Sequence, residues 1–141
     1  RALKMWSRIN RGTPEYPGLV FGMLSGGSCR GMVFRVERAH AHDVMVNLWQ
    51  REMPLAVYDP RWLTCHTMQG PVQALAFTLS RQSPSHTGEL HEDEYRRIFL
   101  QASGRYGTTR DYAQATFDEL RRQGIHDRAL ARLLALSLPK S

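Results

Sequence analysis

Residues 11 to 18 carry two prolines and two glycines in eight positions, and this density constrains the fold more than any other stretch. Proline fixes φ and lacks a backbone N–H, and glycine weakens helix and strand interiors, so a regular element cannot run through the segment. We therefore predict a shaped loop that follows a short strand over residues 2 to 9. Residues 19 to 24 and 29 to 36 are strand-like, and the Ser25–Ser28 turn between them predicts a hairpin.

The remaining elements are one helix, then two strands and finally three helices, and their ends carry recognisable turn and capping residues. The apolar positions of the second strand beyond Pro60 are nearly continuous, which predicts cover on both of its faces. This order of elements predicts an α+β fold: a small antiparallel sheet or barrel with flanking helices, forming one domain over residues 1–141. The expected elements are a helix over 39–52, strands over 61–68 and 72–79 with a Gly70-Pro71 turn, a helix over 90–102, a helix from Thr108 or Thr109 to Gly124, and a last helix capped by Asp127 and lined by Leu130, Leu133, Leu134 and Leu138.

The helix over 39–52 has an unusual end. Apolar residues recur at helical spacing between 44 and 49, and Pro54 requires the helix to stop near Glu52. A carboxylate at a helix C-terminus opposes the macrodipole, which costs about 0.3–1 kcal/mol and favours the protonated carboxyl. Two explanations stay open: Glu52 forms an ion pair with Arg51 or Arg61, or a function requires it there.

Charge and cysteine content argue against several classes of protein. The net charge is +6, but the arginines are scattered and alternate with acids, which is typical of solvated helix faces, so we expect no nucleic-acid partner. We expect no membrane segment and a cytoplasmic location, because no apolar run approaches the roughly 18 residues of a span and no signal-peptide block is present. The two cysteines form no CxxC pair, so neither a zinc site nor a disulfide framework is indicated.

Two further stretches could bind a ligand. His86, Glu89, His91 and Glu92 resemble a metal-ligand set in composition, but a loop leading into an acid-rich helical turn explains them better. Residues 103 to 109 place glycines before a helix N-terminus, where free N–H groups can hold a carboxylate. The alternative is a plain connection between two helices.

Four blocks of the sequence, spread in order over nearly the whole chain, form a recognisable set. The blocks are Arg11-Gly12-Thr13-Pro14-Glu15-x-Pro17-Gly18, Gly27-Ser28-Cys29-Arg30-Gly31-x-x-Phe34-Arg35-Val36, Leu48-Trp49-x-Arg51-Glu52-Met53 and Ala102-Ser103-Gly104-x-x-Gly107-Thr108-x-x-Asp111-Tyr112. Together they resemble the ChaC family, whose members similar to this chain are glutathione-specific γ-glutamylcyclotransferases. The resemblance implies a closed or nearly closed small sheet and a lyase that needs no cofactor and releases 5-oxoproline and Cys-Gly from glutathione.

The same resemblance implies site residues. Glu52 occupies the place of the catalytic glutamate and would act as general acid and base, while Tyr58, Tyr112, Ser103 and Gly104 would bind the substrate. No metal ligand is implied. The loop of residues 11 to 18 is expected to shape the rim of the site, without an assigned role.

The sequence also departs from the family. It contains no Tyr-Gly-Ser-Leu loop, the family's substrate cradle, so we expect the opening strand to be missing and the chain as given to bind substrate poorly. Tyr106 and Thr109 stand where the family tends to have a small residue and asparagine, and the bulk of Tyr106 is expected to narrow or re-aim its loop. A non-catalytic binding or regulatory module on the same fold is therefore the alternative. The sequence predicts no oligomeric state.

Overall fold

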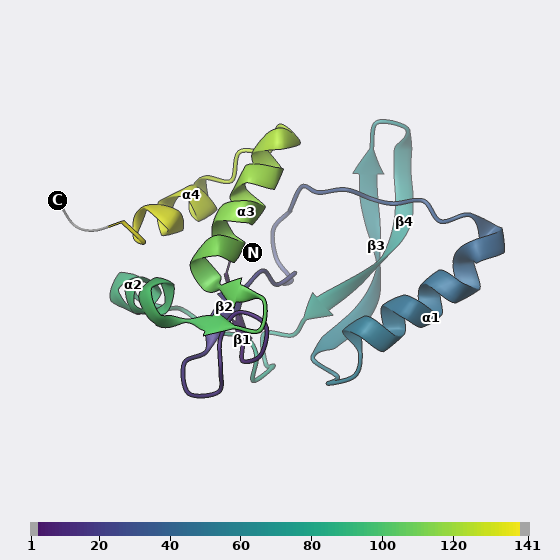
Figure 1. Cartoon of the computed structure of the whole chain (residues 1–141). Helices are drawn as coiled ribbons and strands as arrows, with labels where there is room; N and C mark the ends of the chain where they lie inside the picture. Colours follow the sequence, from purple (N-terminus) through teal and green to yellow (C-terminus); the bar gives the residue numbers. More distant parts are fainter. Residues whose placement is uncertain (1–2, 139–141) are drawn as a thin grey trace. The chain divides into compact units, whose positions relative to one another are not determined.

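The computed structural model describes residues 3 to 138, and their contacts divide the chain into two compact units (Figure 1). The terminal unit comprises the chain up to Gly22 and from Pro84 onward. The central unit is Met23–Ser83. Each unit contains its own helices and its own antiparallel strands.

In the terminal unit two helices lie against a short pair of strands, and a third helix packs on one of these two (Figure 1). The two strands are antiparallel, with Met5 opposite Val20 and Ser7 opposite Gly18. A second, very small hairpin connects two of the helices. The elements are β1 (Met5–Ser7), β2 (Gly18–Val20), α2 (Glu92–Gln101), β5 (Ser103–Gly104), β6 (Gly107–Thr108), α3 (Thr109–Arg122) and α4 (Arg128–Ala135).

The core of the terminal unit is formed by residues from both ends of the chain. Leu3, Leu19 and Leu130 are completely buried there. Fully burying a leucine side chain stabilises a fold by about 1.5–3 kcal/mol. The helix α2 contributes a stripe at the i, i+3, i+4, i+7 spacing of one face, which explains why its sequence forms a helix in this place. The stripe consists of Tyr95, Ile98, Phe99 and Ala102.

The helix ends in this unit follow the capping rules. The Thr108 hydroxyl accepts from the Asp111 N–H at 3.0 Å, and Asp127 Oδ1 accepts from the Leu130 N–H at 2.9 Å. Gly124 has φ +72°, a left-handed conformation typical of the residue after a helix. These predicted ends are confirmed. The predicted leucine stripe stops short of Leu138, which is exposed because α4 ends at Ala135.

The central unit consists of one helix beside one long hairpin (Figure 1). Its elements are η1 (Arg38–His40), α1 (Ala41–Glu52), β3 (Tyr58–Thr67) and β4 (Gly70–Leu79). The strands pair antiparallel from Tyr58 opposite Leu79 to Thr67 opposite Gly70, so the turn lies at residues 68–69 and not at Gly70-Pro71 as predicted. Trp49 of α1 contacts Phe77 of β4 edge-to-face, with ring centroids 6.4 Å apart.

Two strand predictions were wrong. Residues 19–24 and 29–36 form no hairpin, because β2 ends at Val20 and pairs with β1, while residues 29–36 form no strand and are exposed. The strand β4 is not covered on both faces, since Leu79 is its one buried residue. Apolar, β-branched sequence favours strands only where a partner strand and packing are present.

The α+β class with antiparallel strands and flanking helices is confirmed. The strands of the described residues form three two-stranded sheets: β1–β2, β3–β4 and β5–β6. None of the helices in residues 3–138 has the length and apolar character needed to cross a membrane.

Candidate functional site

The five residues predicted to form the site belong to different units. Glu52 and Tyr58 lie in the central unit, at the end of α1 and the start of β3. Ser103, Gly104 and Tyr112 lie in the terminal unit, on β5 and α3.

Glu52 is the last residue of α1, as predicted from Pro54. The Met53 N–H still donates to the Trp49 carbonyl at 3.0 Å, and Met53 has φ −104° and ψ −4°. These angles lie in the bridge region, between helical and extended backbone. The position of Glu52 at the C-terminal end of a helix is therefore confirmed.

The Glu52 carboxylate is ion-paired with its neighbour. Glu52 Oε1 accepts from Arg51 Nε at 2.8 Å, so the pair anticipated from the sequence is present with Arg51. The Glu52 side chain is only 24% exposed, whereas that of Arg51 is 72% exposed. An exposed arginine holds a carboxylate weakly, by about 0–1 kcal/mol. A carboxylate can accept several hydrogen bonds, so Glu52 retains acceptor capacity beside this pair.

A shaped turn separates Glu52 from Tyr58. The Ala56 N–H donates to the Met53 carbonyl at 3.0 Å, and Ala56 adopts φ +48°. A left-handed conformation costs a residue other than glycine about 1–2 kcal/mol, so this turn is strained. Tyr58 then enters β3 opposite the buried Leu79. Local geometry therefore sets the spacing of the two residues.

In the terminal unit, the loop of residues 11–18 and the two residues before it, Ile9 and Asn10, interlock with the β5–β6 hairpin. The Arg105 N–H donates to the Ile9 carbonyl at 2.8 Å, and the Tyr106 N–H donates to the Asn10 carbonyl at 2.9 Å. Two of the four sequence blocks thus form a single structure, although they lie far apart in the chain. From the sequence, residues 11 to 18 were expected only to shape the rim of the site; their pairing with the hairpin could not be predicted, because spacing within one block says nothing about another.

Glycines make this interlock possible. A Cβ on Gly104 would lie 2.5 Å from the Ile9 carbonyl oxygen and 2.6 Å from the Gly12 nitrogen. A Cβ on Gly18 would overlap the Arg11 carbonyl oxygen and the Thr109 hydroxyl. The neighbouring atoms are mostly backbone atoms, which cannot move aside easily. The motif glycines therefore serve close backbone approach.

Thr109 ties the same structure to β2. Its hydroxyl, which is completely buried, donates to the Arg11 carbonyl at 3.0 Å and accepts from the Leu19 N–H at 3.0 Å. The one hydroxyl thus links the backbone of Arg11 to the backbone of Leu19. In the sequence Thr109 is a candidate helix cap and a departure from the asparagine typical of the family, and nothing there indicates the bridge.

Tyr112 faces Arg11 and Phe21. Its hydroxyl accepts from the Phe21 N–H at 3.1 Å, and the two rings meet edge-to-face with centroids 6.4 Å apart. The Arg11 guanidinium lies 5.3 Å from the Tyr112 ring centroid. Burial raises the pKa of Tyr112 above its usual value of 10.0, and the Phe21 N–H and the Arg11 charge oppose the rise. Tyr112 is therefore a neutral phenol in a fixed position.

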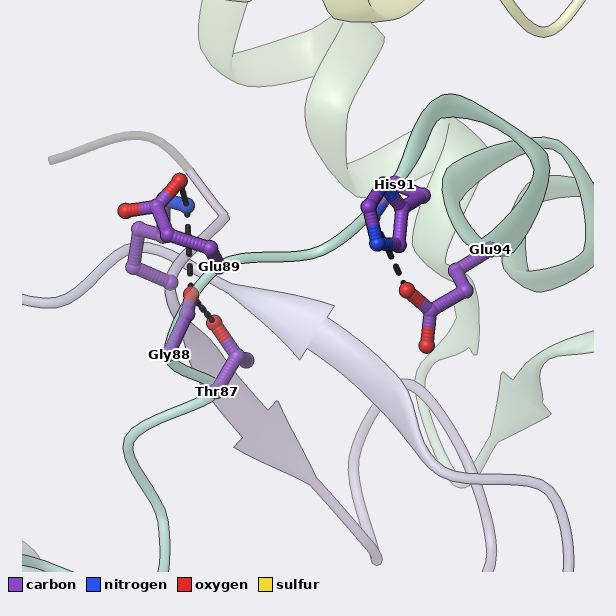
Figure 2. Close-up of polar contacts among 6 residues, drawn as sticks. Thr87, Gly88, Glu89, His91 and Glu94 are labelled. Carbon is purple, nitrogen blue, oxygen red and sulfur yellow. Dashed lines mark hydrogen bonds and ion pairs between the residues drawn. The ribbon is translucent and has the colours of Figure 1, made fainter.

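The His and Glu side chains near residue 90 do not converge on a metal site. The Glu89 carboxylate pairs with Lys4 at 3.3 Å, and Glu94 accepts from the His91 N–H at 2.9 Å, at the start of α2 (Figure 2). Glu92 pairs with Arg132 at 3.1 Å. Within residues 3–138, no three His, Cys, Asp or Glu side chains are grouped so that they could hold a metal ion. The interpretation of this stretch as a helix start is confirmed.

Comparison with known proteins gives consistent matches. A family model described as ChaC-like protein matches residues 1–138. The glutathione-specific γ-glutamylcyclotransferase of Escherichia coli K12 is 27% identical over 135 residues, which are 95% of this chain but only 58% of that protein. Two crystal structures of a yeast γ-glutamyl cyclotransferase specific to glutathione match 95% of this chain. Their TM-scores are 0.75 and 0.69, at 15% and 16% identity, with 81% and 83% of those chains covered. At such identities the structural likeness supports the fold.

Proposed function

The chain belongs to the ChaC-like protein family, and from that premise we propose that it is a γ-glutamylcyclotransferase that cleaves glutathione. The observation that carries the proposal is the match of 95% of the chain to the E. coli glutathione-specific enzyme. The chain spans 58% of the length of that relative. A half-buried glutamate at the end of α1, within one of the four sequence blocks, supports the assignment.

The proposed reaction is an intramolecular acyl transfer. The α-amine of the γ-glutamyl group attacks its own γ-carbonyl carbon, a new C–N bond closes the ring, and the amide bond to cysteine breaks. The products are 5-oxoproline and Cys-Gly, and no water is consumed. Because the reacting groups belong to one molecule, the protein gains most by holding the γ-glutamyl chain in its folded conformation.

Glu52 would serve as the general acid and base. The attacking amine is an ammonium ion in solution, so a base must first remove a proton from it. Glu52 can accept that proton at a carboxylate oxygen and return it to the nitrogen of the departing Cys-Gly. For this step the substrate must displace or share the contact with Arg51, whose exposed side chain can move away.

The terminal-unit residues would bind the substrate. Tyr112 presents a neutral phenol held by Phe21 and Arg11. Ser103 is exposed on β5, next to Gly104, whose close contacts fix the backbone. Tyr58, at the start of β3, is proposed for the same role. The scheme requires no metal or nucleotide, and a cytoplasmic location stays a prediction of the sequence.

The test is release of 5-oxoproline and Cys-Gly from glutathione by the natural protein and by its Glu52→Gln variant. Loss of a general acid–base should lower kcat by roughly 10²–10⁴-fold. The matched control is Asp43→Asn, which neutralises an exposed carboxylate on the same helix and should retain wild-type activity.

Two outcomes would contradict the proposal. If Glu52→Gln is as active as Asp43→Asn, Glu52 is not the general acid and base. A wild-type protein that binds glutathione but releases no 5-oxoproline would instead be a non-catalytic binding module.

A further inference from the structure

Arg105 lies at the tip of the β5–β6 hairpin, and its charge has no carboxylate partner among residues 3–138. Its N–H is bound to the Ile9 carbonyl, so the backbone at this residue is fixed. Its guanidinium lies 5.4 Å from the centroid of the Tyr106 ring. Among residues 3–138 the guanidinium has no carboxylate partner and no hydrogen bond. An arginine that is held but unpaired in this way can receive an anionic ligand.

Tyr106 is the platform that holds this arginine. Its N–H donates to the Asn10 carbonyl, and its own carbonyl accepts from Arg11 Nη1. Gly107, with φ +103°, allows the chain to turn directly after it. Tyr106 is 59% exposed, which leaves one face of its ring available to a cation. The β5 and β6 strands pair on either side of the turn that carries Tyr106.

The electrostatic surroundings favour an anion. Arg8 and Arg11 lie in the loop to which this hairpin is hydrogen-bonded, and neither has a carboxylate partner in the described part of the chain. Residues 7–12 and 103–109 contain no aspartate or glutamate. Asp111, in the first turn of α3, is the acid that follows the hairpin in sequence. Because Arg11 Nη1 contacts the Tyr106 carbonyl, the positive charges of Arg11 and Arg105 both lie at this hairpin, where they raise the local concentration of anionic ligands.

Resting on the proposed function, we propose that Arg105, held over Tyr106, is a specificity residue that selects γ-glutamyl substrates with a carboxylate at the far end, such as the glycyl carboxylate of glutathione. Its neighbours Ser103 and Gly104 are proposed substrate-binding residues. The planar guanidinium can donate two parallel hydrogen bonds to a carboxylate. A neutral ester or amide at the same position would lose that charge-assisted pair.

The test compares glutathione with its glycyl amide. We expect the wild-type kcat/KM to favour the free acid by about tenfold, which corresponds to roughly 1.4 kcal/mol. Arg105→Gln should abolish this preference, and Arg105→Lys should retain part of it. The preference should also shrink as ionic strength rises, because salt screens exposed charges. The control Arg97→Gln removes an exposed arginine from α2 and should keep the wild-type preference.

A second pair of variants tests the platform itself. Tyr106→Phe keeps the aromatic face and should keep the preference, whereas Tyr106→Ala should reduce it several-fold toward that of Arg105→Gln. A structural role of the hairpin alone would affect acid and amide equally.

The inference is overturned if wild type does not distinguish acid from amide, or if Arg105→Gln distinguishes them as well as wild type. Calorimetric binding of the same two ligands provides the readout if neither is turned over. In that case the proposed reaction fails, while the ratio of the two dissociation constants still decides the role of Arg105.

Discussion

The two compact units differ in how they bury apolar residues. The terminal unit has a core in which Leu3, Leu19 and Leu130 are inaccessible to solvent. In the central unit, residues 23–83, Leu79 is the one buried residue. Most of the exposed large apolar side chains of the described residues belong to this unit, including Phe34 (77%), Leu55 (72%) and Trp62 (66%).

This difference shows that a unit can form regular secondary structure without forming a buried apolar core. The central unit has the longest strands of the chain, ten residues each, yet they form only a two-stranded hairpin. Such a hairpin is at best marginally stable alone, and its support comes from backbone pairing and contacts such as Trp49 with Phe77. The terminal unit has shorter strands but gains stability from packing. Equivalent substitutions should therefore cost more there.

The largest difference is expected from removing a leucine side chain in each unit. Leu130→Ala leaves a cavity in the terminal core and should lower the free energy of unfolding by about 2–5 kcal/mol. Leu55→Ala removes the same atoms from an exposed site of the central unit and should change it by less than about 0.5 kcal/mol. Urea denaturation followed by circular dichroism measures both. Equal losses would show that the central unit is also packed in solution.

A smaller difference is expected for glycine-to-alanine changes. Gly104→Ala would drive its Cβ into backbone atoms of residues 9 to 12, which should cost about 1–3 kcal/mol. The control Gly31→Ala in the central unit has open space around its new methyl group and should be neutral or slightly stabilising. The same denaturation experiment applies. A neutral Gly104→Ala would contradict the interlock of the two motif loops.

The smallest effect concerns the pH dependence of the terminal unit. The pKa of Tyr112 is raised in the folded state, so above about pH 10 the unfolded chain loses this proton while the folded chain retains it. The contribution of Tyr112 to stability is thus fully present below that pH and is lost as pH rises through the folded pKa. The Tyr112→Phe variant has no phenol to ionise at this position, so it does not lose this stability as pH rises. The stability difference between wild type and variant should therefore narrow in alkaline denaturation series, and a constant difference would contradict the shift.

Several parts of the fold followed from local chemistry. Helical spacing predicted α1 to α4, and Pro54, Thr108, Gly124 and Asp127 predicted their ends, because each acts on the backbone within a few residues. Four ordered blocks of the sequence also indicated the family to which the chain belongs. The placement of Glu52 at a helix end also came from this local information.

The segment of residues 29–36 shows where local chemistry stops. Its β-branched and aromatic residues favour a strand. The partner expected at residues 19–24 does not form as one strand, because β2 ends at Val20. Residues 18–20 pair with β1, and Leu19 is bound to the Thr109 hydroxyl and buried in the terminal core. A strand forms only with a partner strand. Because Leu19 pairs within the terminal unit, residues 29–36 have no partner strand and form none.

The sequence by itself determined the helices, their ends, the α+β class, the family and the residue expected to be the base. Only the tertiary structure decided which strands pair, which apolar residues form a core, and how the two glycine-bearing blocks interlock through Gly104 and Thr109. The physical reason is the range of the forces involved. Capping and helix periodicity act between near neighbours in sequence, whereas close packing and strand pairing depend on residues that only folding brings together.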